Sequence, residues 1–509
     1  MPTDRLFELS MLAGYLVLLL WIGLRSARRI QTSDDYTLAG RNVAWTVVLA
    51  TTAATMIGGG ASVGMTARVY EVGIAAAFVT CGWHLQLLFT GLFAAPKLRG
   101  LNLITVGDYF HLKFGPLARE LAVVNCIIFL VGALTAQMAA MGTVTNTILG
   151  VPYATALLIG ATVTVFYATV GGMRAVVNTD VLQFAILVAG LGTAAALLVG
   201  RHGGFEPMLA AASEGQAALT SNWSMTKVVS LFFAFLLGET FAPPYTVRCF
   251  IAKSSAQARK GVAGAGIFLL LFLPIVTFTL GTAAQIDPGV QAAVAAEQEQ
   301  VIERAAAIGQ EISQDAALDR AYQVAFPELV RSTFHPAFAG IMIAAIIAAV
   351  MSSADSCLSC FATVVMEDTY RRHINEKATD RQLLRVAQGT TLVAGAAAAV
   401  CAFFFNNVAD ILVFVYDFWA PTMVVPFLIG IFWYDRTRVY AVVVSMIVGI
   451  ISTVVWRFGL GSPGDIGPAL FGIVAAAVAF LLALPLTRHL PPSPLFQPHE
   501  QGENTGATA

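Results

Sequence analysis

The sequence predicts an all-α integral membrane protein with about thirteen transmembrane helices, and three observations lead to that prediction. The 509-residue chain is 57% hydrophobic and 12% charged, whereas soluble domains contain about 25% charged residues. Its mean hydropathy is +0.75. Many apolar stretches reach the roughly 20 residues that cross a bilayer. They cover residues 7–27, 44–70, 73–95, 119–148, 152–170, 176–200, 225–249, 260–284, 334–366, 382–405, 408–432, 438–457 and 466–487.

The chain begins with a short segment, residues 1–6, that is expected outside the cell. The first apolar run, residues 7–27, is expected to remain as an extra first helix because no cleavage-site pattern follows it. Arg25, Arg28 and Arg29 lie at the C-terminal end of this run, and placing them in the cytoplasm also puts most of the 29 Lys and Arg residues there. The expected location is therefore the inner cell membrane, with multiple spans and the C-terminus in the cytoplasm.

The remaining elements follow in order along the chain. Residues 44–200 and 225–432 are expected to form two units of five helices each, and residues 438–487 two further helices. The external insertion, residues 286–333, contains helix-forming stretches and is expected to carry a short surface helix. The tail, residues 488–509, is rich in Pro, Gly, Asn and Gln and is expected to be disordered in the cytoplasm.

Two spans are interrupted midway. The second contains the sequence MIGGG at residues 56–60, and the seventh contains GETFAPP at residues 238–244. Glycine weakens a helix and proline removes backbone donors, and freed backbone groups in a membrane must face protein, water or a ligand. The breaks lie five spans apart, in segments that enter from opposite sides. Matching breaks of this kind indicate the binding site of a secondary transporter, although packing kinks remain an alternative.

Acidic side chains within spans require a reason, because each costs at least about 2.5–3.5 kcal/mol at the bilayer centre. Asp180 is expected near a cytoplasmic helix start, where it would cap backbone donors. Glu239 lies in the second break and Asp417 lies midway along the eleventh span. Binding or gating is the favoured role of these two. Glu239 could instead be neutralised by Arg248 or carry a proton.

A run of small polar groups in the ninth span suits a hard monovalent cation. The hydroxyls of Ser352 and Ser353 and the carbonyl of Ala349 offer three oxygens from one helix. Carbonyls released at the glycine break could complete such a shell. The alternative is that both serines only bond back to the preceding turn of their own helix.

The chain resembles the sodium:solute symporter family from about residue 7 to residue 457. Three motifs carry the resemblance: LAGRNVAWTVVLATTAATMIGGGASVGMTARVYEVG, VGGMRAVVNTDVLQ and AAIIAAVMSSADSCLSCFATVVMEDTYRR. The GGG break, the MSSADS stretch and PTMVVPFLIGIF are most similar to the high-affinity choline transporters and their bacterial relatives, and proline symporters are somewhat further away.

The resemblance implies a leucine-transporter-like fold, a five-plus-five inverted repeat with one extra helix before it and two after. It also implies a sodium site where the broken second span meets the ninth. The implied ligands are the carbonyls of Ala54, Ile57 and Ala349 and the hydroxyls of Ser352 and Ser353, with Asp180 supplying charge nearby. Proline symporters carry an aspartate where this chain has Met56. Choline transporters carry tryptophans that align with Met56 and Ala242, so two walls of an aromatic cage are absent here.

These observations predict sodium-coupled symport of a small polar organic solute, amine-like or amino-acid-like, into the cell by alternating access. The expected partners are this solute and the lipid bilayer, and sodium is the coupling ion with no other cofactor or metal. A proton-coupled symporter, with Glu239 or Asp417 carrying the proton, and a transporter-derived sensor remain alternatives. An enzyme is not expected because the histidines are scattered, and nucleic acid is not expected because the net charge is −1. The expected substrate contacts are Met56, Gly59, Gly60, Gln137, Glu239, Phe241, Tyr245 and Asp417.

Overall fold

The computed structural model describes residues 3–307, 311–404, 407–434, 438–487 and 489–490. The described secondary structure is helical apart from one isolated bridge between Val43 and Ala252. The helices are α1 (Thr3–Ala27), α2 (Ser33–Leu38), α3 (Trp45–Ile57), α4 (Met65–Val72), α5 (Ile74–Phe89), α6 (Ala95–Gly100), α7 (Val106–Leu149), α8 (Tyr153–Arg201), α9 (Phe205–Ala210), α10 (Met225–Gly238), α11 (Pro243–Ile251), α12 (Ser255–Ile286), α13 (Pro288–Ala307), α14 (Gln314–Ala321), α15 (Ala325–Thr333), α16 (Pro336–Thr363), α17 (Asp380–Phe404), α18 (Val408–Phe432), α19 (Val439–Val454) and α20 (Pro468–Thr487).

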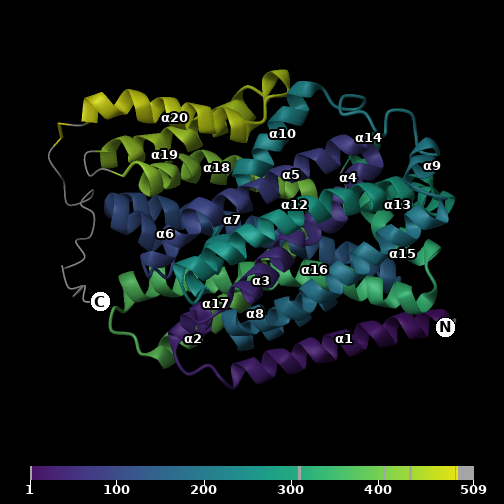
Figure 1. Ribbon diagram of the computed structural model, residues 1–509, viewed down its shortest axis with the longest axis horizontal. Coiled ribbons are helices and arrows are strands. Elements are labelled where there is room, and N and C mark those ends of the chain that lie inside the picture. The colour runs from purple at the N-terminus through teal and green to yellow at the C-terminus, as the bar shows by residue number, and fades with distance from the viewer. Residues whose placement is uncertain (1–2, 308–310, 405–406, 435–437, 488, 491–509) are drawn as a thin grey trace.

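The spans run side by side along the long axis of the molecule, as Figure 1 shows. At one end lie α9, α13, α14 and α15 together with the start of α1, and at the other end lie α2 and α6. We call these the insertion end and the α6 end. The start of the first helix and the polar insertion therefore share one end, as the charge pattern predicts.

Ten helices in the described part of the chain are long and apolar enough to cross a membrane, and two bent pairs raise the count to 12. One of the ten, α8, has 49 residues and would measure about 74 Å if straight, more than twice the roughly 30 Å hydrocarbon core. Its backbone breaks at Gly172, where φ is 49° and a Cβ would lie 2.6 Å from the Tyr36 ring. We therefore assign both the fifth and the sixth expected spans to α8.

The two bent pairs fall on the breaks that the sequence predicts. The first joins Trp45–Ile57 to Gly60–Val72 at 53°, and its second half begins with a π-helical turn, Gly60–Gly64. The second joins α10 to α11 at 41°. Four residues separate α10 from α11, and among them Phe241 has a positive φ of 62°. Pro243 and Pro244 then begin α11, where a missing N–H costs no helical hydrogen bond.

The insertion contains more structure than the single short helix expected. It forms α13, of 20 residues, followed by α14 and α15. On α13, Val290, Val294, Val301 and Ala305 are buried, so an apolar stripe of helical period packs this helix onto the spans. Ser313 caps α14 by accepting a hydrogen bond from the Ala316 N–H at 3.2 Å.

Candidate functional site

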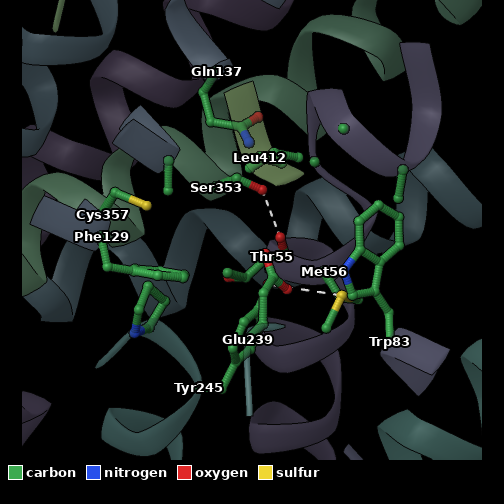
Figure 2. Close-up of a pocket in the computed structure, with 15 residues that line it drawn as sticks. Thr55, Met56, Trp83, Phe129, Gln137, Glu239, Tyr245, Ser353, Cys357 and Leu412 are labelled. Carbon is green, nitrogen blue, oxygen red and sulfur yellow. Dashed lines mark hydrogen bonds between the residues drawn. The ribbon is translucent and has the colours of Figure 1, made fainter. Parts of the chain in front are cut away.

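A small cavity of about 30 Å³ lies between the two helix breaks (Figure 2). It has room for only about one or two water molecules and is too small for an organic solute. Side chains of α5, α7, α16 and α18 complete its walls. Its lining residues are Thr55, Met56, Gly58, Gly60, Ala61, Trp83, Phe129, Ala133, Gln137, Glu239, Pro244, Tyr245, Ser353, Cys357 and Leu412.

The glycines of the first break are needed because neighbouring helices approach the backbone closely. A Cβ at Gly58 would lie 2.3 Å from Ser353 Oγ, and one at Gly60 would lie 2.3 Å from Leu412 Cδ1. The Gly59 N–H donates to Gln137 Oε1 at 2.7 Å. Gly59 itself does not line the cavity. The side chain of Gln137 therefore holds the interrupted backbone in place.

The expected sodium ligands of α3 and α16 lie together. Ser352 Oγ is 2.9 Å from the carbonyl oxygens of both Ala54 and Ala349. One residue further along α16, Ser353 Oγ donates to the Thr55 carbonyl at 2.5 Å and faces the central cavity. These groups are uncharged oxygens, the ligand type that a hard monovalent cation requires.

Ile57, the remaining expected ligand, is the last residue of α3 and is fully buried. Its carbonyl thus belongs to the edge of the break, three residues beyond Ala54. No hydrogen bond ties this carbonyl to Ser352 or Ser353 in the part of the chain that the structure describes.

Asp180 does not cap a helix start, because it lies two turns past the break at Gly172 and inside the core. Its Oδ2 pairs with Arg248 Nη2 at 3.1 Å and also accepts a hydrogen bond from the Thr51 hydroxyl. Both charged side chains have 0% exposure. The helix-capping expectation for Asp180 is therefore wrong, and an ion pair explains its burial.

Arg248 joins α11, the second half of the second break, to α3, α8 and α16. Its Nη2 lies 2.9 Å from Thr55 Oγ1 on α3 and 2.6 Å from Ser356 Oγ on α16, in addition to its contacts with Asp180 and Thr51. Ser356 follows Ser352 by one turn of α16. This fixed cation thus lies next to the oxygens of the expected sodium site.

Glu239 occupies the second break and is only 7% exposed. Its Oε1 accepts a hydrogen bond from the Tyr416 hydroxyl at 2.6 Å, and that hydroxyl accepts one from Trp83 Nε1 at 3.2 Å. Its Oε2 has no hydrogen-bond partner among the described residues. Arg248 does not neutralise Glu239, since Arg248 pairs with Asp180. The free carboxylate oxygen lies in a cavity lined by Trp83 and Phe129.

Of Met56 and the two expected aromatic residues, Met56 and Tyr245 lie at the cavity and Phe241 does not. The Tyr245 hydroxyl contacts Met56 Sδ at 3.7 Å, and both residues line the cavity (Figure 2). Phe241 does not line it. Its ring stacks on Phe427 at 4.5 Å, next to Tyr109 near the start of α7. Phe241 therefore belongs to the aromatic layer that closes the α6 end.

Asp417 is an expected substrate contact, but its side chain points away from the central cavity. Its carboxylate pairs with Arg457 and accepts a hydrogen bond from the Ala469 N–H at 2.9 Å, near the start of α20. Successive residues of a helix point about 100° apart, so the inward position of the preceding Tyr416 turns Asp417 towards the two C-terminal helices. Asp417 is absent from the cavity lining.

The sequence did not point to Trp83 and Phe129, which line the cavity, or to Tyr416, whose hydroxyl holds Glu239. An aromatic residue in an apolar span gives the same signal whether it packs or lines a site. The sequence contains one signal for Tyr416, because this residue immediately precedes Asp417, an acid expected in the site. Trp83 and Phe129 are distinguished from packing residues by their place in the cavity lining and by their contacts with Tyr416.

Charged residues close the insertion end above the cavity. Arg68 on α4 lies 2.7 Å from Asp410 on α18, 2.6 Å from Glu71 and 3.6 Å from Asp319 on α14. These ion pairs connect one half of the first break to the span that carries Tyr416. The central cavity is thus closed by ion pairs at one end and by stacked aromatic rings at the other.

Two broken spans around a closed polar cavity define a secondary transporter. The sequence model of the sodium:solute symporter family matches residues 36–449, and the chain belongs to that family. A Sodium/glucose cotransporter of Vibrio parahaemolyticus is 26% identical, over 86% of this chain and 82% of that protein. A High-affinity proline transporter of Bacillus subtilis (strain 168) is 25% identical, over 86% and 89%.

Further comparisons agree with the family and with the fold. A High-affinity choline transporter 1 of Drosophila melanogaster is 24% identical over 77% of this chain and 61% of that protein. A solved structure of a Na+-coupled sialic acid symporter in a substrate-bound outward-open state superposes with a TM-score of 0.77. It is 20% identical and covers 94% of this chain and 97% of that one. The leucine-transporter-like fold expected from the sequence is therefore confirmed.

Proposed function

We propose that this protein is a sodium-coupled symporter for a small solute that carries a positively charged nitrogen. The observation that carries the proposal is the Glu239 carboxylate at the second helix break, with Oε1 held by Tyr416 and Oε2 near Tyr245 but without a hydrogen-bond partner among the described residues. Burying an uncompensated carboxylate is costly, so the site favours a cation there. Trp83 and Phe129 present aromatic surfaces in the same cavity, and aromatic rings attract an ammonium group.

The remaining lining residues would contact the part of the solute that does not carry the charged nitrogen. Met56 lies at the first break, where Gln137 also holds the backbone, and Tyr245 of the second break contacts Met56. A solute seated there would contact both broken spans at once. The proposal includes amines and amino acids.

Sodium is proposed to bind between α3 and α16, at the carbonyls of Ala54, Ile57 and Ala349 and the hydroxyls of Ser352 and Ser353. Asp180 adds negative charge close to this set, and Arg248 balances it. Because Ser353 also lines the central cavity, an ion bound here would order the first break beside the solute. Each sodium ion that enters would contribute about 2.3 kcal/mol per 100 mV of membrane potential.

In the proposed transport cycle, the contacts at the two ends of the molecule separate one after the other. We assign the insertion end to the outside of the cell membrane, where separation of Arg68 from Asp410 would admit the solute and sodium. Separation of Phe241 from Phe427 would release them to the cytoplasm. The central cavity holds about 30 Å³, so neither step can occur without movement of a half-helix.

The test is uptake by the purified protein in liposomes with an inward sodium gradient. A panel of radiolabelled choline, betaine, proline, other amino acids, polyamines, monocarboxylates and sugars is supplied in sodium and in potassium. The proposal expects a nitrogen cation or zwitterion to accumulate only in sodium, and Glu239→Gln to abolish that uptake. Accumulation of an uncharged sugar or a monocarboxylate by the wild type, unaffected by Glu239→Gln, would contradict the assigned solute class.

Proton coupling remains the second candidate, and the free Glu239 oxygen favours it. In that case, a pH gradient would drive uptake in the absence of sodium. Glu239→Gln would then uncouple uptake from the pH gradient while leaving exchange of solute across the membrane intact. The sodium proposal expects no such sodium-free uptake.

A further inference from the structure

A second and much larger cavity, of about 860 Å³, opens at the insertion end. It shares no lining residue with the central cavity. Its roof is one face of α13, on which Ala293, Ala296, Gln300 and Arg304 lie three or four residues apart. Its volume falls within the range of about 300–1,000 Å³ that is typical of small-molecule sites.

The charges in this cavity do not balance. Arg304 on α13, Arg320 on α14 and Arg331 on α15 line it, and the carboxylates among its described lining residues are Glu297 and Glu328. Arg304 lies 3.1 Å from Glu297, and Arg331 lies 3.5 Å from Glu328. No ion pair engages Arg320 among the described residues. The cavity therefore carries an excess positive charge.

The floor of the cavity continues into a lipid-facing surface. Phe403 and Phe404, at the end of α17, line the cavity and are 51% and 59% exposed. Along the same helix, Leu392, Val393 and Val400 are also exposed. The exposed apolar residues of α17 thus form a strip that leads to the cavity that the arginines line. A phospholipid has the same order of groups, with apolar acyl chains followed by a phosphate.

We propose that the cavity binds the head group of an anionic phospholipid from the leaflet on the insertion end. The phosphate contacts Arg320 and Arg304, and the acyl chains follow the strip from Phe404 to Val393. A soluble anion would use the arginines but gain nothing from the strip, which is why the structure favours a lipid. The bound lipid would bridge α13 and α14 to α17 and so fix the insertion to the spans.

The experiment measures the thermal unfolding midpoint of the full-length protein in a neutral detergent during titration with lipid. Phosphatidylglycerol is compared with phosphatidylcholine of the same acyl chains, and with glycerol 3-phosphate and inorganic phosphate. The variants are Arg320→Gln and Phe404→Gln. The matched control is Arg259→Gln, which removes an exposed arginine from the first turns of α12, away from the cavity.

Phosphatidylglycerol is expected to raise the midpoint at lower concentration than phosphatidylcholine. Arg320→Gln should weaken the apparent affinity for phosphatidylglycerol about fivefold, the usual contribution of one basic residue at an anionic lipid surface. Phe404→Gln should weaken both lipids, and Arg259→Gln neither. The midpoint in phosphatidylcholine shows whether each variant is folded.

Three results would overturn the proposal. The first is equal affinity for the two lipids, and the second is an unchanged affinity for phosphatidylglycerol in Arg320→Gln. The third is stabilisation by glycerol 3-phosphate or inorganic phosphate equal to that by the lipid, because the strip would then contribute nothing. None of these results depends on which solute the central cavity transports.

Discussion

Replacing Asp180 by asparagine is expected to destabilise the protein strongly. Asp180 and Arg248 are 3.1 Å apart and both have 0% exposure, so the substitution leaves a buried guanidinium without its counter-charge. Removing one partner of such a pair costs about 3–5 kcal/mol. The Thr51, Thr55 and Ser356 hydroxyls remain near Arg248 Nη2, but none of them carries charge.

The assay is chemical unfolding of the purified protein in detergent, with the double variant Asp180→Asn/Arg248→Met beside each single variant. Removal of both charges should recover a large part of the free energy of unfolding that Asp180→Asn loses, because buried ion pairs can often be replaced by apolar groups at little cost. The control is Asp35→Asn, whose partner Arg174 is 32% exposed, with an expected loss of about 0–1 kcal/mol. A double variant as unstable as the sum of its single changes would refute the charge-pair reasoning.

Three further predictions concern the central site. Ser353→Ala should raise the sodium concentration needed for half-maximal uptake at least about fivefold, since a ligand worth about 1 kcal/mol is removed; an unchanged sodium dependence of uptake would contradict the proposed ion site. Gly58→Ala should cost about 1–3 kcal/mol in unfolding experiments because its Cβ would lie 2.3 Å from Ser353 Oγ, whereas Gly200→Ala, with nothing within 4 Å, should not destabilise. Arg68→Gln should open the insertion end and speed thiol labelling of Cys357, which lines the cavity, in a variant whose other cysteines are replaced; an unchanged labelling rate would show that Arg68 does not control access.

Local features of the chain determine the helices and both breaks. Apolar length fixes where a span lies, and the helix is interrupted at Gly58–Gly60 and before the adjacent Pro243 and Pro244. The breaks accordingly fall at the expected residues, with bends of 53° and 41°. The insertion contains more helix than expected because polar residues separate the Val and Ala residues of its buried stripe, which weakens the helical pattern in the sequence.

The site was predicted less completely. Residues adjacent to a break, such as Met56 and Glu239, line the cavity because interrupted backbone brings them there. Asp417 lies far from any break, and the direction of its side chain depends on how α18 is rotated against α19 and α20. The sequence also left open whether Glu239 would be neutralised by Arg248 or carry a proton. The ion pair with Asp180 depends on the packing of α11 against α8, which are distant in sequence.

By itself the sequence determined a membrane protein of thirteen expected spans, two broken helices, and a serine pair one turn from Ala349. Each of these follows from composition or from spacing within one helix. Only the tertiary structure decided that Trp83, Phe129 and Tyr416 surround Glu239 and that Asp417 does not. The physical reason is that every span is apolar on nearly all sides, so periodicity does not tell which face meets the cavity and which meets lipid. That choice is made when the helices pack, because packing fixes the rotation of each helix about its axis.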